Sequence, residues 1–277
     1  MLTWEEAVEW LRNQPEKSEL VKFCYYDDPL ETAAERFLQS EEWLEVLSLL
    51  KSKSSGHVLD IGAGRGISSY AFAKSGYEVT ALEPNPSLLV GAEAIRQLSS
   101  HTGVNIKVVQ DWGETLPFAD NTFDIVYGRA VLHHAYDANK LCKEAARVLK
   151  PGGILLVTRE HVISRLEDLP KFLDSHALHY LYGGENAFLL QEYIEAINQA
   201  GLKLKRLLGP WDSVINYAPM TKAEFHAMIS SKFPGGIGRN LFQKLVLLKP
   251  LENLIARYLS RKSQSPGRHY SFLAIKA

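Results

Sequence analysis

Three glycines at alternate positions follow an apolar strand pattern, and their spacing is the clearest sign of chemistry in this chain. They are Gly62, Gly64 and Gly66, with Ala63 between the first two and Asp60 two residues before them. Glycine adopts positive φ easily and lets a ligand come close to the main chain. A dinucleotide fingerprint would place its third glycine one residue later, and Asp60 would repel a pyrophosphate. The turn therefore predicts a ligand with little negative charge or with an ammonium group. The alternative is an ordinary strand-to-helix turn.

Acidic residues also end the next two strand patterns. Glu83, followed by Pro84, lies about twenty residues beyond the glycines, where an acid can accept hydrogen bonds from both hydroxyls of a ribose. A 2′-phosphate would be repelled there; the alternative is a solvated helix-capping acid. Asp111 precedes Trp112, so a carboxylate could bind an adenine amine while the indole covers the ring. The alternative is a surface acid beside a core tryptophan.

The apolar spacing predicts strands that alternate with helices from residue 58 onward. The predicted strands cover residues 58–61, 78–82, 106–110, 123–127, 154–158, 202–208 and 269–275. The predicted helices between them cover residues 67–75, 86–100, 138–149, 163–181 with a break at Pro170, and 189–200. This alternation indicates a mainly parallel sheet covered by helices on both faces. Ligands of such sheets bind beyond the carboxyl ends of the strands, where the acids and the glycine turn stand.

We interpret the chain as a single domain over residues 1–277. Residues 1–52 form an N-terminal helical cap, whose first helix starts at a capping box of Thr3 and Glu6. Residues 56–160 form the ligand-binding core. Residues 161–277 supply helices on the substrate side, with an insertion at about 217–266 before the last strand.

The composition excludes several classes of protein. With 277 residues, 46% hydrophobic and 23% charged, the chain resembles an ordinary globular protein. No apolar run approaches the roughly 18 residues of a membrane span, and the acidic N-terminus is unlike a signal peptide. Two cysteines, Cys24 and Cys142, fit reduced thiols in a cytoplasmic protein. The net charge of −1 argues against a nucleic-acid partner.

Four motifs in order, over about Val58 to Thr158, resemble those of the class I S-adenosylmethionine-dependent methyltransferases, in particular the small-molecule group. The motifs are VLDIGAGRG, LEPN, DWGETLPFADNTFDIVYGRAVLHHAYD and LKPGG. The resemblance implies a Rossmann-like, seven-stranded, mostly parallel sheet with helices on both faces, an antiparallel final strand and an extra helical cap. It also implies S-adenosylmethionine as cofactor and a small-molecule acceptor, such as a sugar or another metabolite.

The resemblance assigns roles to the motif residues. Asp60 and the glycine turn would hold the methionine end, Glu83 the ribose, and Asp111 with Trp112 the adenine. The full cofactor set is Asp60, Gly62, Ala63, Gly64, Gly66, Glu83, Pro84, Asp111, Trp112 and Arg129. Alternatives are a lipid-linked or membrane-surface acceptor and a non-catalytic partner protein that keeps the cofactor fold. A dehydrogenase is disfavoured by the early third glycine and by Asp60.

The loop after residues 123–127 carries His133 and His134, which we expect beside the methyl group. One hypothesis is that either histidine acts as a general base or orients the acceptor; the alternative is that both only form hydrogen bonds within the loop. Further residues that could reach an acceptor are Tyr25, Tyr26, Arg129, Glu160 and His161. Arg129 could instead pair with an acid, and the tyrosines could pack against the core.

We predict no metal. A few resembling quinone-pathway methyltransferases bind a metal through acids and a histidine in this loop. In this chain Ala130 and His133 stand where those acids would be, and only His134 matches.

The segment 232–268 is basic, with eight Lys or Arg and one acid, Glu252, for a net charge of +7. Its apolar face is formed by Leu241, Phe242, Leu245, Leu248, Leu251, Leu254, Ile255 and Leu259. One interpretation is contact with a membrane surface or an acidic acceptor. We favour a helical lid with solvated basic residues.

Overall fold

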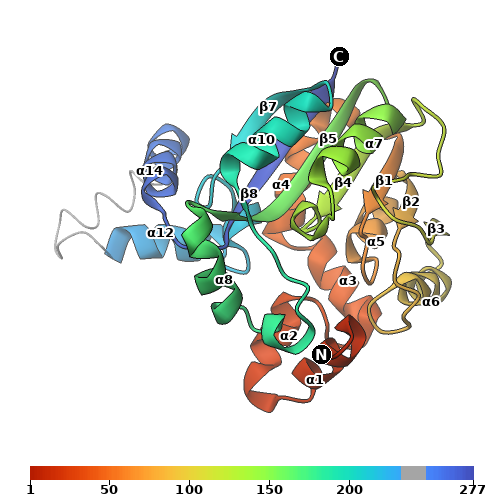
Figure 1. Cartoon of the computed structure of the whole chain (residues 1–277), viewed down its shortest axis with the longest axis horizontal. Coiled ribbons are helices and arrows are strands. Elements are labelled where there is room, and N and C mark those ends of the chain that lie inside the picture. Colours follow the sequence, from red (N-terminus) through yellow and green to blue (C-terminus); the bar gives the residue numbers. More distant parts are fainter. Residues whose placement is uncertain (232–247) are drawn as a thin grey trace.

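A mixed sheet forms the centre of the protein (Figure 1). The computed structural model describes residues 1–231 and 248–277, and in this part of the chain the sheet has eight strands in the order β3-β2-β1-β4-β5-β8-β7, with β6 paired to β5. The strands are β1 His57–Ile61, β2 Glu78–Leu82, β3 Ile106–Val109, β4 Phe123–Arg129, β5 Leu149–Ile163, β6 Phe188–Leu189, β7 Leu202–Leu208 and β8 Arg268–Lys276. Strands β1 to β6 pair in parallel, and β8 is antiparallel to both β5 and β7. The predicted Rossmann-like fold with an antiparallel last strand is confirmed, with β6 as one strand more than predicted.

Helices cover both faces of the sheet, which is why its strands read as continuous apolar runs. On one face α3 (Leu30–Leu38), α4 (Glu41–Leu49) and α5 (Ile67–Lys74) pack on buried residues such as Tyr127 and Leu156. On the other face α7 (Ala138–Val148) and α10 (Leu190–Gln199) pack on Val126 and Leu155. The alternation along β4 and β5 divides these side chains between two cores.

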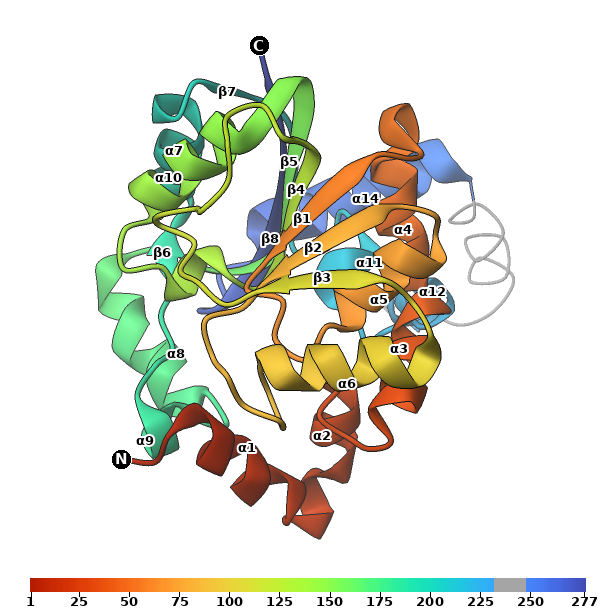
Figure 2. The ribbon, with the colours of Figure 1, turned by 90° about the vertical axis from the view of Figure 1, so that its right-hand side faces the viewer.

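The N-terminal helices lie beyond the carboxyl ends of the parallel strands (Figure 2). Helix α1 (Trp4–Arg12) begins at the predicted capping box, in which the Glu6 amide donates to Thr3 Oγ1 and the Thr3 amide donates to the Glu6 carboxylate. Helix α2 (Ser18–Phe23) follows. Helix α1 packs near the short α9 (His179–Tyr182), and the Leu2 amide donates to the Leu181 carbonyl. Two segments that are far apart in the sequence therefore lie side by side beyond the carboxyl ends of the strands.

The helix predicted over residues 86–100 is wrong in its first part, because α6 spans Ala92–Thr102. The chain before it is held in turns by its own side chains. Asn85 Oδ1 accepts from the Ser87 amide, and Ser87 Oγ accepts from the amides of Leu89 and Val90. Such local bonds compete with helix formation.

The helix predicted over residues 163–181 is wrong in its first part, and its remainder forms two short helices. Strand β5 runs on through Ile163, since Val162 and Ile163 pair with β6. Helix α8 (Leu169–Ser175) then starts with Pro170 in its first turn, a position that proline tolerates, so this residue begins the helix instead of breaking it. His176 takes an extended conformation and separates α8 from α9.

The C-terminal helices form a separate layer on the sheet face that carries α4. They are α11 (Val214–Tyr217), α12 (Lys222–Ser231) and α14 (Lys249–Lys262). Trp211, Tyr217 and Phe225 stack on one another, and Ile255 and Leu259 of α14 pack against this cluster. Three of the eight residues of the predicted apolar face, namely Leu241, Phe242 and Leu245, lie outside the described residues. Among the residues that are described, none of the helices combines the length and apolarity of a membrane span.

Candidate functional site

The glycine turn joins β1 to α5 at the switch point of the sheet, where β2 lies on one side of β1 and β4 on the other. Gly62, Gly64 and Gly66 have φ values of 62°, 55° and 82°. A Cβ atom on Gly62 would lie 2.5 Å from Val131 Cγ2, and one on Gly66 would lie 3.0 Å from Ile95 Cγ2. One on Gly64 would meet no described atom within 4 Å. Gly62 and Gly66 therefore permit close packing, and Gly64 turns its backbone to open space.

Asp60 lies beneath this turn and is 1% exposed. Its Oδ2 accepts from the hydroxyls of Ser68 and Ser69 at 2.7 and 2.6 Å, which ties the end of β1 to the first turn of α5. Burial raises the pKa of the Asp60 carboxyl to about 6, against the effect of the two serine hydrogen bonds. The Ala63 amide donates to the Leu82 carbonyl, so the turn is also fixed to β2.

Glu83 comes from the end of β2 and meets the turn directly. Its Oε2 accepts from the Gly64 amide at 2.8 Å, and its Oε1 accepts from the Asn85 amide, just past Pro84, at 2.9 Å. Burial raises the pKa of the Glu83 carboxyl to about 7, although both amides favour the charged form. Since each oxygen accepts one described backbone amide, each keeps a lone pair for a further donor.

Asp111 and Trp112 follow β3. The Trp112 side chain is 55% exposed, so the alternative of a core tryptophan is wrong. Its ring lies 6.0 Å from that of Tyr136, which is also exposed. Asp111 Oδ1 accepts from the Trp112 amide. An exposed indole suits a residue that covers a planar ligand, and the adenine role stays a prediction.

Arg129 is held by an ion pair. It donates from Nε and Nη2 to the Glu42 carboxylate at 2.7 and 3.2 Å, and its guanidinium lies over the rings of Tyr25 and Phe37. Burial alone would raise the pKa of the Glu42 carboxyl, but Arg129 and Arg159 bring it below its usual value. Pairing with an acid, the alternative left open for Arg129, is what the structure shows.

A cavity of about 990 Å³ opens beside this pair. The end of β4 supplies Arg129 and β5 supplies Arg159. The loop after α2 supplies Tyr25, α4 supplies Glu42, and Met220 comes from the segment before α12. Arg159 Nη1 donates to the carbonyls of Ile215 and Ala218, which fixes this wall. The cavity lies at the carboxyl end of β4 and beside Arg159 of β5, on the side of the sheet where ligands are bound.

Glu160 does not reach an acceptor, which corrects the expectation for this residue. It is 0% exposed, and its carboxylate accepts from the amides of Val131, Leu132 and His133, each at 3.1 Å. His133 Nδ1 lies 2.7 Å from Glu160 Oε2. Glu160 therefore holds the loop after β4 in shape from the neighbouring strand.

The other predicted site residues divide between the cavity and the protein interior. Tyr25 lines the cavity, whereas Tyr26 packs with Trp4 and Tyr182, so only the first tyrosine is placed to meet an acceptor there. His161 turns Nδ1 toward the Gly267 carbonyl at 2.7 Å.

Of the two loop histidines, His133 is buried and His134 is partly exposed. His134 Nδ1 lies 3.1 Å from the Gly184 carbonyl. The role of either histidine as a base stays a prediction.

Sequence reasoning missed several residues. Arg65 stands within the glycine motif, and its guanidinium bonds the Tyr25 and Asp27 carbonyls and the Asp28 carboxylate. Glu42 reads as an ordinary acid in the first turn of a helix, so nothing in its local pattern reveals the partner 87 residues away. Glu185 follows two glycines, Gly183 and Gly184, and this pattern predicts a turn but no site.

Comparisons with known proteins agree with this geometry. Residues 59–157 match the model of a methyltransferase domain family. Residues 59–157 form a methyltransferase domain, and the fold around it is that of class I methyltransferases. Over 122 residues the chain is 33% identical to an uncharacterized methyltransferase, YcgJ, of Bacillus subtilis. The aligned residues make up 44% of this chain and 47% of that protein. Over 128 residues the chain is 37% identical to the ubiquinone/menaquinone biosynthesis C-methyltransferase UbiE of Vibrio cholerae, covering 45% and 48%. The chain spans about half the length of these relatives.

A solved structure extends the likeness of the methyltransferase domain to the whole fold. Geranyl diphosphate C-methyltransferase from Streptomyces coelicolor, in complex with Mg²⁺, geranyl diphosphate and S-adenosyl-L-homocysteine, superposes with a TM-score of 0.59 at 13% identity. The match covers 97% of this chain and 87% of that one. At this identity the likeness concerns the fold alone.

The cofactor of the methyltransferase domain is S-adenosylmethionine, and the residues at the switch point fit it. Gly64 faces open space that a Cβ atom would enter. Glu83, beside it, keeps free lone pairs that two ribose hydroxyls could fill. We predict that Gly64 and Glu83 bind the cofactor directly and that Asp60 acts by fixing the turn.

Alanine at Gly64 and at Gly62 should have different effects. Gly64→Ala is expected to cost about 1–2 kcal/mol of stability, the penalty of a left-handed alanine, and to weaken S-adenosylhomocysteine binding by about tenfold or more. Gly62→Ala adds the clash with Val131 and is expected to cost about 2–4 kcal/mol. Urea unfolding and calorimetric titration measure the two effects. Equal loss of stability in both variants would contradict the assignment of Gly62 to close packing and of Gly64 to cofactor binding.

Cofactor affinity should depend on pH through Glu83. Ribose hydroxyls donate to the ionised carboxylate, so binding favours loss of the proton from a group whose pKa is about 7. The affinity for S-adenosylhomocysteine should therefore fall by up to about tenfold per pH unit below pH 7 and level off above about pH 8. Titrations in buffers of different ionisation enthalpy should detect proton release near pH 7. A flat profile across this range would refute the assignment.

Proposed function

We propose that this protein transfers the methyl group of S-adenosylmethionine to a polar small molecule, such as a sugar or another hydroxylated metabolite, held in the cavity beside Tyr25 and Arg129. The observation that carries the proposal is the position of the cavity. It opens at the carboxyl end of β4 and beside Arg159 of β5, between the N-terminal helices and the segment before α12.

The cavity wall combines charged groups that can orient a polar acceptor with a larger apolar area that can contact its carbon skeleton. Its acids and bases are mixed, and aromatic rings stand between them. The charged lining residues are Glu19, Lys22, Glu31, Glu35, Arg36, Glu41, Glu42, Arg129 and Arg159, and the aromatic ones are Phe23, Tyr25 and Tyr70. A few polar groups among apolar ones fix the orientation of a small ligand, and this wall has that mixed character.

The glycine turn and the cavity are directly connected. Arg65 of the turn donates to the Tyr25 carbonyl, and the Tyr25 ring lines the cavity. Tyr70, on the helix that starts at Gly66, lines the same cavity and donates its hydroxyl to Glu35. An acceptor here would contact Tyr25 and Tyr70, which are joined to the glycine turn by Arg65 and by α5.

Methyl transfer requires mainly that the acceptor be aligned with the methyl group of the cofactor. The cofactor supplies a methyl group that its sulfonium already activates, and the protein contributes by orienting the acceptor and excluding water. Arg129 is fixed by Glu42 and by two aromatic rings, so it offers little motion to a bound acceptor. If the acceptor is a hydroxyl, removal of its proton needs a base, for which His133 and His134 remain the hypothesis.

Two measurements test the proposal. Binding of S-adenosylhomocysteine is followed by calorimetry, and turnover by transfer of labelled methyl to sugars, nucleotide sugars, amines and quinols. Turnover with hydroxylated polar acceptors that is lost in a cavity variant, Tyr25→Ala, would support the function. Cofactor binding without transfer to any of them would favour the non-catalytic partner protein. Alanine at His133 and His134 tests the base: turnover unchanged across pH would exclude it.

A lipid-linked acceptor is the second candidate, because α14 exposes apolar side chains beside basic ones. Leu254 and Tyr258 are 66% and 61% exposed, and Arg257 and Arg261 share their helix. Sedimentation with anionic vesicles at low salt tests it. Absence of binding would remove this candidate and leave the cavity proposal in place.

A further inference from the structure

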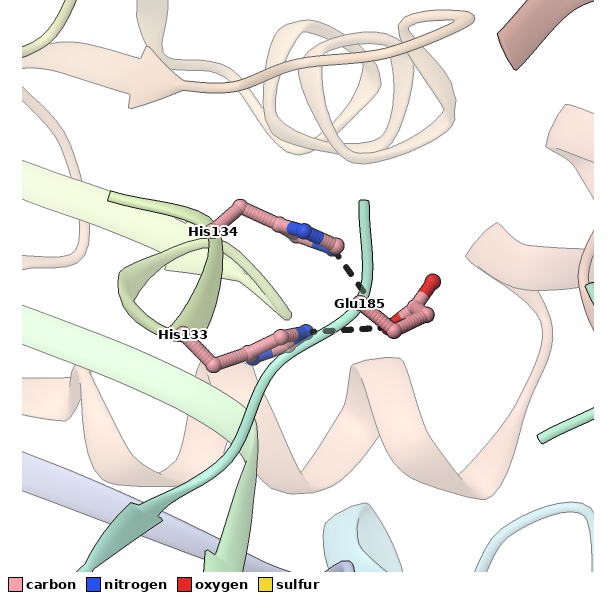
Figure 3. Close-up of side chains that lie close together, drawn as sticks. All are labelled: His133, His134 and Glu185. Atoms are coloured by element: carbon pink, nitrogen blue, oxygen red, sulfur yellow. Dashed lines mark ion pairs between the residues drawn. The ribbon is translucent and has the colours of Figure 1, made fainter. Parts of the chain in front are cut away.

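Four histidines and one glutamate converge on a place outside the lining of the proposed acceptor cavity, and two of them, His133 and His134, are the residues considered above as bases. Ligand atoms of His133, His134 and Glu185 lie within 4.8 Å of one another, and those of His161, His176 and the same Glu185 do so as well. Figure 3 shows the rings of His133 and His134 pointing from the loop after β4 toward Glu185, which comes from the chain segment before β6. One carboxylate is thus shared by two pairs of imidazoles.

The hydrogen bonds of three of the histidines leave their Nε2 atoms free to act as ligands. His133 Nδ1 bonds the Glu160 carboxylate, His134 Nδ1 the Gly184 carbonyl and His161 Nδ1 the Gly267 carbonyl. Each partner is an acceptor, so each Nδ1 carries the proton and each Nε2 of a neutral ring carries a lone pair. Metal-binding histidines are oriented in this way by carboxylates and backbone carbonyls. His176 differs, because its Nδ1 accepts from the Leu178 amide and its Nε2 therefore carries the proton of the neutral ring.

Glu185 is oriented in the same manner. The Tyr182 hydroxyl donates to Glu185 Oε1, and Glu185 is 8% exposed. Its Oε2 lies 3.9 Å from the Nε2 atoms of both His133 and His134, and its Oε1 lies 3.7 Å from His176 Nε2. These separations are too long for hydrogen bonds. Two ligands held about 2.0–2.2 Å from one ion and well apart in angle are separated by roughly 3.3–3.9 Å.

We propose that this cluster binds a divalent first-row transition metal ion such as Zn²⁺, Mn²⁺ or Fe²⁺, with His133, His134 and Glu185 as ligands and His161 and His176 beside them on the shared carboxylate. Imidazole nitrogens with one carboxylate suit such ions. Mg²⁺ and Ca²⁺ prefer oxygen ligands. The partial exposure of His134 leaves a way in for the ion and an open position for another ligand.

This proposal replaces the prediction of no metal, which considered the loop after β4 alone. The sequence separates the ligands by up to 52 residues, and the fold brings them together through β5 and the turn before β6. The cluster does not line the cavity in which we place the acceptor, so the proposal concerns metal binding and assigns the ion no step in methyl transfer. Val131, two residues before His133, packs on Gly62, so the ion would lie near the glycine turn.

Metal binding by the full chain, without an affinity tag and after removal of metals by a chelator, tests the site. Co²⁺ is titrated by visible absorption and calorimetry, followed by competition with Zn²⁺ and Mg²⁺. We expect one Co²⁺ per chain, displaced by Zn²⁺ but not by Mg²⁺. Glu185→Gln and His134→Asn should each weaken it by about 100-fold or more. The control, His101→Asn, changes an exposed histidine on α6 and should bind as the unchanged protein does.

Substoichiometric binding, or binding that both ligand variants leave within about threefold, would overturn the proposal. His176→Asn separates the two trios, because loss of Co²⁺ only in this variant would reject His133 and His134 as ligands. S-adenosylhomocysteine binding shows that each variant is folded, and the exposed His134 gives a result even if Glu185→Gln does not fold. Cofactor binding without metal would refute this site alone, whereas metal binding without methyl transfer would refute the proposed function alone.

Discussion

Replacing Glu42 by glutamine is expected to lower the free energy of unfolding by about 3–5 kcal/mol, the usual cost of breaking a buried ion pair from one side. The Glu42 side chain is 2% exposed, and those of Arg129 and Arg159 are 17% and 14% exposed. Without the carboxylate, two guanidinium groups would face each other in the interior. Urea unfolding with a two-state fit measures the change.

The matched control for this variant is Glu45→Gln, on the next turn of α4. Glu45 pairs with Lys222 at 3.1 Å but is 29% exposed, so its loss should cost less than about 1 kcal/mol. Adding Arg129→Met to Glu42→Gln should recover part of the stability, because it removes one uncompensated charge. Similar losses in the two single variants would show that the pair is not effectively buried.

Replacing Glu83 by glutamine is expected to weaken S-adenosylhomocysteine binding by at least about 100-fold. The carboxylate accepts one backbone amide on each oxygen and is the predicted acceptor for both ribose hydroxyls. A glutamine amide can accept through one atom only and would turn N–H groups toward Gly64 or Asn85. Hydrogen bonds to charged groups contribute about 1.5–3 kcal/mol each, and the loss of two of them accounts for the expected size. Calorimetry at pH 8, where Glu83 is ionised, measures it.

The control for Glu83 is Glu78→Gln, at the exposed other end of β2. It should leave cofactor affinity unchanged. Measuring stability also distinguishes the two explanations for weak binding, namely loss of the ribose contact and loss of the folded structure. Because burial raises the pKa of Glu83, the ionised carboxylate opposes folding at pH 8, and a neutral glutamine should not unfold the protein. Unchanged affinity in a folded Glu83→Gln would show that the ribose is held elsewhere.

The sequence was enough to predict the sheet, because each strand is marked by its own apolar run and each helix by its own spacing of apolar residues. The strand at 58–61, the turn at Gly62 to Gly66 and the acid at Glu83 form one continuous pattern, and all three meet at the switch point. The predicted helices failed where side chains bonded their own backbone, as at Ser87. They failed again where a strand continued past its bulge, as β5 does after Arg159.

The residues that could be identified only from the structure act through partners distant in the chain. Glu42 pairs with Arg129 across 87 residues, and Glu160 supports the loop at 131–133 from the next strand. Glu160 was expected at an acceptor because it follows a strand end, a criterion that ignores the face to which the side chain points. Only the register at the β5 bulge decides that direction.

Arg65 gives the glycine turn a second task. Its neighbour Gly64 donates to the acid assigned to the cofactor, while Arg65 itself holds the backbone of residues 25–28, from which Tyr25 enters the cavity. Gly64 thus contacts the residue assigned to the cofactor, and the next residue, Arg65, holds the loop that lines the acceptor cavity. A shift of the turn on cofactor binding would be passed to the acceptor wall through one guanidinium, and linkage requires the reverse effect to be equally large. The donor and acceptor molecules would then bind cooperatively, with Arg65 as the residue that sets the coupling energy.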